Sequence, residues 1–310
     1  MKHYPKHLVI SLLFLLPQAH TLFAETVRLA TYNVQNYLIT SRMVDGVYRQ
    51  DYPKPEAEKT ALRAIIKRVN PDVLALQEMG SKSFLLELQQ DLEIDGVNYP
   101  HYAVLEEDPA GRYLAVLSKI PFNHIIKHQN IDFKYQNKEA EVKRGLLEVT
   151  FLDNNDQEWG LFVLHLKSRW EKNDKDHQHN KFRAKEAAAI RNRIREHYPK
   201  LEQGRFVVLG DFNDHKKSKA LTRFLKIGNQ PYLHRLIARD SRNELWTYFY
   251  DREARYETID FMLVSPELHT LLPNLSANIA DTPDALIASD HRMLYVDLEF
   301  PDIPQAQPAQ

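Results

Sequence analysis

The chain has 310 residues, of which 43% are hydrophobic and none is cysteine, and its formal net charge is -1 at pH 7. This length and composition predict a globular protein with a packed core and exclude an intrinsically disordered chain. The balanced charge excludes bulk electrostatic attraction to nucleic acid or to an anionic membrane, so such binding requires a local patch. The lack of cysteine excludes disulfides and a lipoprotein anchor.

The N-terminal residues 1–24 have the layout of a secretory signal peptide. Lys2 and Lys6 give a basic start, an apolar run follows from Leu8 to Leu16, and the segment ends in the small residue Ala24. This layout predicts cleavage after Ala24 and export to the periplasm or the medium. The apolar run is too short to span a bilayer comfortably, so we expect no stable membrane anchor.

Strands are predicted along most of the chain, in short segments rich in Val, Leu, Ile and aromatic residues. These segments lie at residues 27–34, 72–77, 114–118, 145–152, 159–166, 205–210, 258–264 and 293–300. Two stretches of helix formers, 56–69 and 181–198, predict helices that stop before Pro71 and Pro199. The class is therefore α/β, and the sheets are expected to be mixed because several strands follow one another directly.

The domain organisation follows from what the sequence lacks. No repeat recurs at a fixed period, and no linker rich in Pro, Gly or Ser interrupts the interior. We therefore expect one domain over residues 25–301. The Pro- and Gln-rich residues 302–310 predict a disordered tail.

Residues 167–185 form a cationic segment, with seven Lys or Arg against three Asp or Glu. Two interpretations stay open for it. Such a run is commonly a solvated loop. Alternatively, it forms a cationic rim for a phosphate backbone, which would make binding dependent on salt.

Polar residues recur at or just beyond the ends of the predicted strands. They are Asn33, Glu78, His165, Asp211, Asn213, Asp260, Asp290 and His291. Each alone has an ordinary alternative: Asp211 and Asn213 could form an Asx turn or cap a helix starting near Ser218, and His165 could be a satisfied core histidine. Buried carboxylates are costly unless paired, hydrogen-bonded or bound to metal. Their recurrence at strand ends therefore predicts one shared site.

The chemistry of this set is that of a hard cation and of proton transfer. Carboxylate and amide oxygens without thiols suit Mg²⁺ or Mn²⁺. Two histidines beside aspartates suit proton transfer and the stabilisation of developing negative charge. No GxSxG elbow and no cysteine offer a nucleophile. Metal-assisted hydrolysis of a phosphoester is the reaction that this combination favours.

The motifs TYNVQN, LALQE, LAVLSK, HLKS, LGDFND, TIDFMLVSP and SDHR occur in this order over residues 27–299. The ordered set resembles the endonuclease/exonuclease/phosphatase superfamily, whose branches include deoxyribonucleases, repair nucleases, sphingomyelinases and inositol-polyphosphate phosphatases. The resemblance implies an α/β fold: a four-layer sandwich of two packed mixed β-sheets flanked by helices.

The resemblance also implies roles for the site residues. Glu78 would be the principal metal ligand, with Asn33 and Asp290 completing the metal site. His291, oriented by Asp260, would stabilise the charge of the scissile phosphate.

The remaining roles concern water, leaving group and phosphate. Asp211 would position or deprotonate the attacking water, and Asn213 would hold the phosphate or the water. His165 would be the acid at the leaving oxygen. Arg112 would add a phosphate contact, although it could also be a plain loop arginine.

Three residues near the motifs qualify this assignment. Gln35 stands where many relatives carry an acid, which favours a single main metal site. Phe261 follows Asp260 where a histidine or tyrosine is common, a change that we interpret as packing. Gly210, before Asp211, predicts that the backbone needs room where the ligand approaches.

The substrate is predicted with alternatives. An exported enzyme with a cationic segment beside HLKS favours a nuclease that acts on DNA or RNA. The first alternative is a sphingomyelinase-like phospholipid phosphodiesterase, for which the aromatic residues of 245–256 would have to enter a membrane rather than pack on the protein. The others are a small-molecule phosphatase and a catalytically dead metal- or partner-binding protein.

Overall fold

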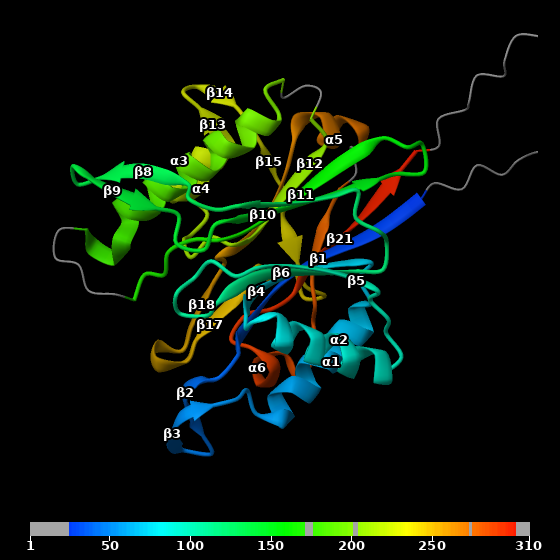
Figure 1. Ribbon diagram of the computed structural model, residues 1–310, viewed down its shortest axis with the longest axis vertical. Coiled ribbons are helices and arrows are strands. Elements are labelled where there is room, and N and C mark those ends of the chain that lie inside the picture. The colour runs from blue at the N-terminus through cyan, green and yellow to red at the C-terminus, as the bar shows by residue number, and fades with distance from the viewer. Residues whose placement is uncertain (1–24, 171–175, 201–203, 273–274, 302–310) are drawn as a thin grey trace, which may run out of the picture.

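The computed structural model describes residues 25–170, 176–200, 204–272 and 275–301 (Figure 1). The predicted signal peptide, residues 1–24, and the predicted tail, residues 302–310, lie outside this part of the chain. Within it, no helix combines the length and the hydropathy that a membrane-spanning helix needs.

The first sheet contains seven strands and holds both ends of the described chain. Its order is β16 (Ala238–Arg239), β20 (Ala277–Ile279), β21 (Leu294–Phe300), β1 (Glu25–Tyr37), β4 (Val73–Met79), β6 (Tyr113–Ser118) and β5 (His101–Leu105). Strands β1 and β4 are parallel, and so are β16 and β20, whereas the other neighbours are antiparallel. The sheet is therefore mixed, as predicted.

The second sheet contains six strands. Its order is β15 (His234–Arg235), β19 (Asp260–Val264), β12 (Phe206–Asp211), β11 (Glu158–His165), β10 (Leu146–Leu152) and β7 (His124–His128). Only β11 and β12 are parallel, so this sheet is mixed as well. The register places His165 opposite Asp211 and Asp211 opposite Asp260.

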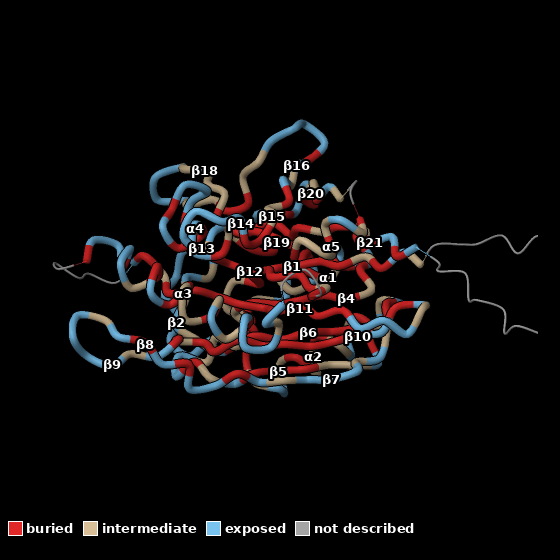
Figure 2. Tube along the Cα trace, turned by 90° about the horizontal axis from the view of Figure 1, so that it is seen from above, coloured by how far each residue is buried: buried red, intermediate tan, exposed pale blue. Residues whose placement is uncertain are grey.

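The two sheets pack face to face over an apolar core, to which both contribute alternate residues such as Leu29, Ala75, Val149, Leu161 and Leu209. The outer faces are covered by helices (Figure 1). Helices α1 (Glu56–Val69) and α2 (Lys82–Ile94) pack on the first sheet, and α3 (Asn180–His197) and α4 (Lys219–Leu225) on the second. Figure 2 shows the buried strands at the centre. The predicted four-layer sandwich is confirmed.

Local signals explain where the predicted helices begin and end. Helix α1 has the predicted bounds, because Pro55 precedes it and Asn70 ends it in the left-handed conformation. Helix α3 lies one residue before the predicted 181–198. Ser218 caps α4, accepting a hydrogen bond from the Leu221 N–H.

Several elements were not predicted. They include two short helices, α5 (Pro266–Leu271) and α6 (Ala285–Ala288), and the 3₁₀ turns at His177–His179 and Asp251–Glu253. Four two-stranded hairpins pair β2 (Thr40–Val44) with β3 (Val47–Tyr52), β8 (Asp132–Tyr135) with β9 (Lys138–Glu141), β13 (Lys226–Ile227) with β14 (Gln230–Pro231), and β17 (Tyr248–Tyr250) with β18 (Arg255–Glu257).

Candidate active site

The predicted polar residues meet at one end of the sandwich, where strands of both sheets terminate. The parallel strands β1 and β4 carry Asn33 and Glu78 near their carboxyl ends. The parallel strands β11 and β12 end in His165 and Asp211 in the second sheet. Parallel strands bring their carboxyl ends to one edge, and the two sheets present those edges to each other.

Asp211 is the centre of this arrangement. Its Oδ2 accepts a hydrogen bond of 3.1 Å from Asn33 Nδ2, which crosses from one sheet to the other. The same oxygen lies 3.3 Å from His165 Nε2 and 3.8 Å from His291 Nε2. Its Oδ1 accepts 2.7 Å from the Asn213 N–H, which closes an Asx turn. Oδ1 of Asp211 thus forms the predicted Asx turn, and Oδ2 contacts the other residues of the predicted shared site.

The surroundings of Asp211 keep it ionised. Burial alone would raise its pKa, but the hydrogen bond from His165 and the charge of His291 hold the pKa of Asp211 well below its usual range. Burial and the charge of Arg144 lower the pKa of His165. His165 therefore lies beside the carboxylate as a neutral imidazole that donates from Nε2, and its buried Nδ1 has no hydrogen-bond partner among the described residues.

A second histidine is held by its own carboxylate. His291 Nδ1 lies 2.9 Å and 3.1 Å from the two oxygens of Asp260, and Thr247 Oγ1 donates 2.7 Å to Asp260 Oδ2. Burial opposes a charge on the imidazole, but Asp260 and Asp211 outweigh it and raise the pKa of His291 to about 10. Burial raises the pKa of Asp260 to about 6. At neutral pH the pair is therefore an imidazolium facing Asp211 and a carboxylate behind it.

Glu78 lies in an irregular stretch of β4. Its backbone has a φ of +60°, and the pairing of β4 with β6 shifts register between Gln77 and Met79. The Asn36 N–H donates 3.0 Å to Glu78 Oε2, and Arg112 Nε lies 4.0 Å from the same oxygen. Arg112 also donates 2.6 Å to Asn36 Oδ1. These contacts turn the carboxylate of Glu78 toward the site, and they place Arg112 there too.

Asp290 completes the acidic cluster. Its N–H donates a hydrogen bond of 3.0 Å to Gln35 Oε1. Gln35, which stands where an acid was expected, therefore fixes the backbone of Asp290. Burial raises the pKa of Asp290 to about 6, and the negative charges of Glu78 and Asp211 add to the rise. This repulsion between oxygen donors fits a site for a hard divalent cation, which would offset it.

A cavity of about 380 Å³ opens over these groups. Six of the nine predicted site residues line it, namely Glu78, Arg112, Asp211, Asn213, Asp290 and His291. The other three, Asn33, His165 and Asp260, are buried behind this lining and contact Asp211 or His291. The structure thus brings all nine residues together.

Sequence reasoning missed several residues of the lining. Lys143, Arg144, Trp170 and Tyr248 were not singled out, although all four face the cavity. The Tyr248 ring lies 4.8 Å from that of His291, measured between centroids. Arg144 directly precedes the predicted strand 145–152, and Tyr248 belongs to the aromatic residues of 245–256, so a weak signal existed for both.

The prediction for Gly210 was wrong in its reason. Its φ is +134°, and a Cβ there would lie 2.0 Å from the carbonyl oxygen of Leu164 on β11. Glycine is required here because β11 and β12 approach each other closely just before His165 and Asp211, and not because a ligand needs room.

The cationic segment 167–185 is only partly a rim. Residues 171–175 lie outside the described part, whereas Lys167 and Arg169 line the cavity. Arg183, in contrast, is fully buried and lies 3.2 Å from Asp214 Oδ2. Arg183 is therefore a structural residue that joins α3 to the loop after β12.

The aromatic segment 245–256 packs largely on the protein. Tyr248 is buried against His291, and Arg292 stacks on Trp246 at 4.0 Å from the ring centroid. Tyr256 is the exposed member, at 55%. Tyr250 stacks on Trp170 with ring centroids 4.3 Å apart. Phe261 packs edge-on against Phe212, in agreement with a packing role.

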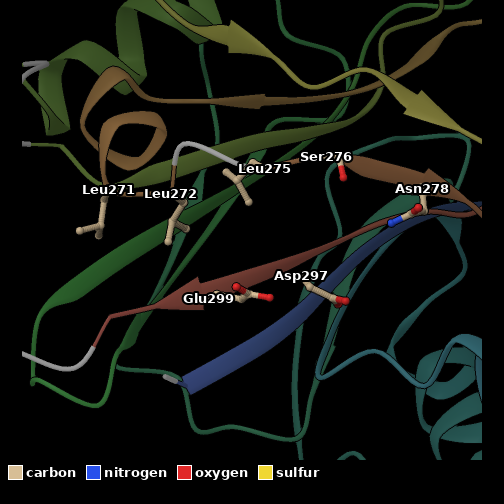
Figure 3. Close-up of a pocket in the computed structure, with 7 residues that line it drawn as sticks. All are labelled: Leu271, Leu272, Leu275, Ser276, Asn278, Asp297 and Glu299. Carbon is tan, nitrogen blue, oxygen red and sulfur yellow. The ribbon is translucent and has the colours of Figure 1, made fainter. Parts of the chain in front are cut away.

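A separate hollow of about 300 Å³ lies where α5, β20 and β21 meet (Figure 3). Its lining is Leu271, Leu272, Leu275, Ser276, Asn278, Asp297 and Glu299. None of the predicted site residues lies there, so the convergence described above is confined to one end of the sandwich.

Comparison with solved structures identifies the fold. The human Nocturnin catalytic domain with bound sulfate anion is 14% identical, with 89% of this chain and 94% of that chain covered and a TM-score of 0.62. A beta toxin mutant from Staphylococcus aureus with bound magnesium ions is 16% identical, with 88% and 99% covered and a TM-score of 0.62. A protein from Bacteroides vulgatus described as an endonuclease/exonuclease/phosphatase is 18% identical, with 89% and 99% covered and a TM-score of 0.57.

Comparison of sequences identifies the family. No curated protein sequence matches this chain. The model of the Endonuclease/Exonuclease/phosphatase family, however, matches residues 30–291, which include every residue of the site described above. The protein therefore belongs to the endonuclease/exonuclease/phosphatase family and is a metal-dependent phosphoric ester hydrolase.

Proposed function

We propose that this protein is an exported phosphodiesterase that uses Mg²⁺ or Mn²⁺ to cleave nucleic acid. The observation that carries the reaction class is the meeting of Glu78, Asp211, Asp290 and His291 in one cavity. The export of the protein rests on the layout of residues 1–24.

The metal site in this proposal consists of Glu78 and Asp290, with Asn33 Oδ1 beside them. That amide oxygen accepts 3.0 Å from the Gln35 N–H and keeps a second lone pair for a cation. A bound divalent ion would offset the charge of the phosphate and polarise the phosphoryl group. Gln35 stands where an acid was expected, so one carboxylate fewer surrounds the metal, which favours one main metal site.

In this mechanism the ionised carboxylate of Asp211 positions the attacking water. Its ionised carboxylate faces the cavity, and four polar groups fix its orientation, from Asn33, His165, His291 and Asn213. Asn213 donates its side-chain amide hydrogens to Leu166 O at 3.0 Å and to Asp211 Oδ2 at 3.2 Å, so its side-chain oxygen is left to accept a hydrogen bond from the water.

The two histidines take different roles. The imidazolium of His291 lines the cavity and stabilises charge that develops on the phosphate. His165 is 1% exposed in its side chain and lies behind Asp211. We therefore assign His165 to positioning Asp211 rather than to protonating the leaving oxygen, the role that the family resemblance implied.

The cavity mouth favours nucleic acid as substrate. Trp170 is 50% exposed there and stacks on Tyr250, which gives a flat aromatic face for a base. Lys143 and Lys167 line the same cavity and supply positive charge for the flanking phosphates, whereas Arg169, also in the lining, is paired with Glu257. A base-stacking face next to cationic side chains is the combination that single-stranded nucleic acid requires.

The test uses the protein purified from residue 25 onward, with Mg²⁺ or Mn²⁺ and without it. We expect cleavage of plasmid DNA or RNA that stops when a chelator is added and is lost in Glu78→Gln. Sphingomyelin vesicles and a chromogenic phosphodiester complete the panel. Hydrolysis of sphingomyelin without cleavage of nucleic acid would replace the nuclease by a lipid phosphodiesterase. If the protein hydrolyses none of the three substrates, nucleic acid, lipid or chromogenic ester, the reaction class is refuted.

A pair of variants tests the aromatic face. Trp170→Ala should raise KM for single-stranded DNA by about 5-fold to 150-fold, because stacking contributes about 1–3 kcal/mol per base. Its activity on the small chromogenic phosphodiester should not change. Tyr256→Ala, which removes an exposed aromatic ring that does not line the cavity, is the matched control. Equal effects of both variants on both substrates would argue against base stacking at Trp170.

A further inference from the structure

A second group of metal-ligating side chains lies outside the catalytic cavity, on the helix-covered face of the second sheet. It consists of His128 at the end of β7, Glu148 in β10 and His197 at the end of α3. One ligand atom from each lies within 4.8 Å of the other two. None of the three lines the catalytic cavity.

The sheet register explains how two of them meet. Strand β10 pairs with β7 so that Leu146 faces His128 and Glu148 faces Ile126. His128 and Glu148 are therefore diagonal neighbours on one face of the sheet, within reach of each other. His197 reaches the same carboxylate from above, because α3 crosses this face and ends there.

The donor atoms point at one place. Glu148 Oε2 lies 2.6 Å from His128 Nε2 and 3.4 Å from His197 Nδ1. The two imidazole rings are nearly perpendicular, with centroids 4.8 Å apart. Two imidazole nitrogens thus approach one carboxylate oxygen from different directions, and these three donors form a candidate metal site once the hydrogen bond between Glu148 and His128 opens.

The burial of Glu148 makes this cluster unusual. Its side chain is 2% exposed, and that of His128 is 3% exposed. Among the described residues, the ion pairs of Glu148 are with these two histidines and with no lysine or arginine. A buried carboxylate that has only imidazoles as charge partners is costly, and a dication shared by all three would offset that cost.

The geometry points to a zinc site formed by His128, Glu148 and His197. Two histidine nitrogens and one glutamate oxygen are a known donor set for Zn²⁺, and the nitrogen donors favour Zn²⁺ over Mg²⁺. In a tetrahedral site the donor atoms lie about 3.3 Å apart. The contact of Glu148 with His197 already has this length, whereas that with His128 must lengthen from 2.6 Å.

One position of this zinc site is left for water. The side chain of His197 is 35% exposed, so solvent reaches the cluster from the end of α3. Phe162, fully buried on the same helix-covered face, has its ring centroid 6.4 Å from that of His128. The zinc ion would fasten the C-terminal end of α3 to strands β7 and β10, and its role would be structural.

The test measures zinc binding directly and does not use catalytic activity. The full-length protein is stripped with a chelator and titrated with Zn²⁺ by calorimetry in excess Mg²⁺, so that the acidic catalytic site is competed. Wild type should bind one Zn²⁺ that Mg²⁺ does not displace. Its Tm should rise by about 5 °C at a hundredfold excess of Zn²⁺ over the Kd.

Variants assign the ion to the cluster. His197→Ala, at a partly exposed helix end, should fold and lose zinc affinity by at least about 100-fold. Glu148→Gln keeps the shape of the buried side chain and should lose the zinc-dependent rise in Tm. The matched control is His124→Ala, also on β7, where the histidine lies 3.9 Å from Glu158 outside the cluster.

Two results would overturn the assignment. One is a wild-type protein that binds no zinc in excess Mg²⁺. The other is equal zinc affinity in His197→Ala, Glu148→Gln and wild type. Glu78→Gln, in the catalytic site, should keep the zinc of this cluster, so failure of the proposed nuclease function would leave this result unaffected.

Discussion

The carboxylate of Asp260 holds the imidazole of His291 by Nδ1, at 2.9 Å and 3.1 Å from its two oxygens. This contact leaves Nε2 of His291 directed at Asp211, 3.8 Å away. Asp260 thus fixes both the orientation and the charge of the histidine that faces the phosphate, although Asp260 itself does not line the cavity.

Replacing Asp260 by Asn tests this relationship. The amide cannot stabilise the imidazolium, so the pKa of His291 should fall and the alkaline limb of the pH–activity profile should move to lower pH. We expect kcat to drop by about 10²–10⁴-fold with a smaller change in KM. A profile that keeps its alkaline limb would show that Asp260 only packs against the histidine.

The same pair predicts how stability depends on pH in the metal-free protein. The pKa of His291 is about 10 in the folded state, above the value of about 6.5 for unfolded histidine. The stability that the protonation of His291 contributes is therefore complete below about pH 6.5 and is lost as pH rises through about 10. Urea unfolding in chelator should show a decline of up to about 1.4 kcal/mol per pH unit between about pH 7 and pH 10. His291→Gln should flatten this decline.

Asp290 should lower the stability of the metal-free protein and strengthen metal binding. Burial and the charges of Glu78 and Asp211 raise its pKa to about 6, so its ionised form at neutral pH strains the metal-free protein. Asp290→Asn should increase the free energy of unfolding without metal by about 1 kcal/mol and weaken the binding of Mn²⁺ or Mg²⁺. Thermal unfolding with and without metal measures both effects. A variant that is less stable than wild type in chelator would contradict the repulsion.

Gly210 should be intolerant of any side chain. Gly210→Ala places a Cβ 2.0 Å from Leu164 O, at a φ of +134° that alanine avoids, and should cost more than about 3 kcal/mol. The control is Gly46→Ala, which has a φ of +75° but no atom within 4 Å of the added Cβ, and should cost about 1 kcal/mol. Equal costs, compared by urea unfolding, would mean that the contact with Leu164 relaxes easily.

Most of the sandwich could be predicted because its strands are apolar and its long helices carry clear end signals. Helix α2 was missed although Leu85, Leu88 and Leu92 have helical spacing and are buried, so the signal was present. Hairpin β2–β3 gave no such signal. Every residue of β3 is exposed and β2 has no buried position, so no hydrophobic alternation marks either strand.

The site could be predicted where a side chain ends a strand, as for Asp211 and Glu78, because strand ends have a fixed place in the sheets. The site could not be predicted where the position of a side chain depends on segments outside the two sheets. Trp170 and Tyr248 face the cavity from segments outside both sheets, and their positions depend on packing between those segments. The role of His165 also needed the structure, since burial behind Asp211 cannot be seen in the sequence.

Two hydrogen bonds join β1 to the segment before β21 at the site. Ser289 Oγ donates 2.8 Å to Asn33 O, and the neighbouring N–H of Asp290 donates to Gln35, across more than 250 residues of sequence. Strand β21, which follows, pairs with β1. The active site therefore forms only once the segment from Ser289 to Phe300 has folded onto β1. The residues that finish the site are thus the same residues that lead into the pairing of β21 with β1.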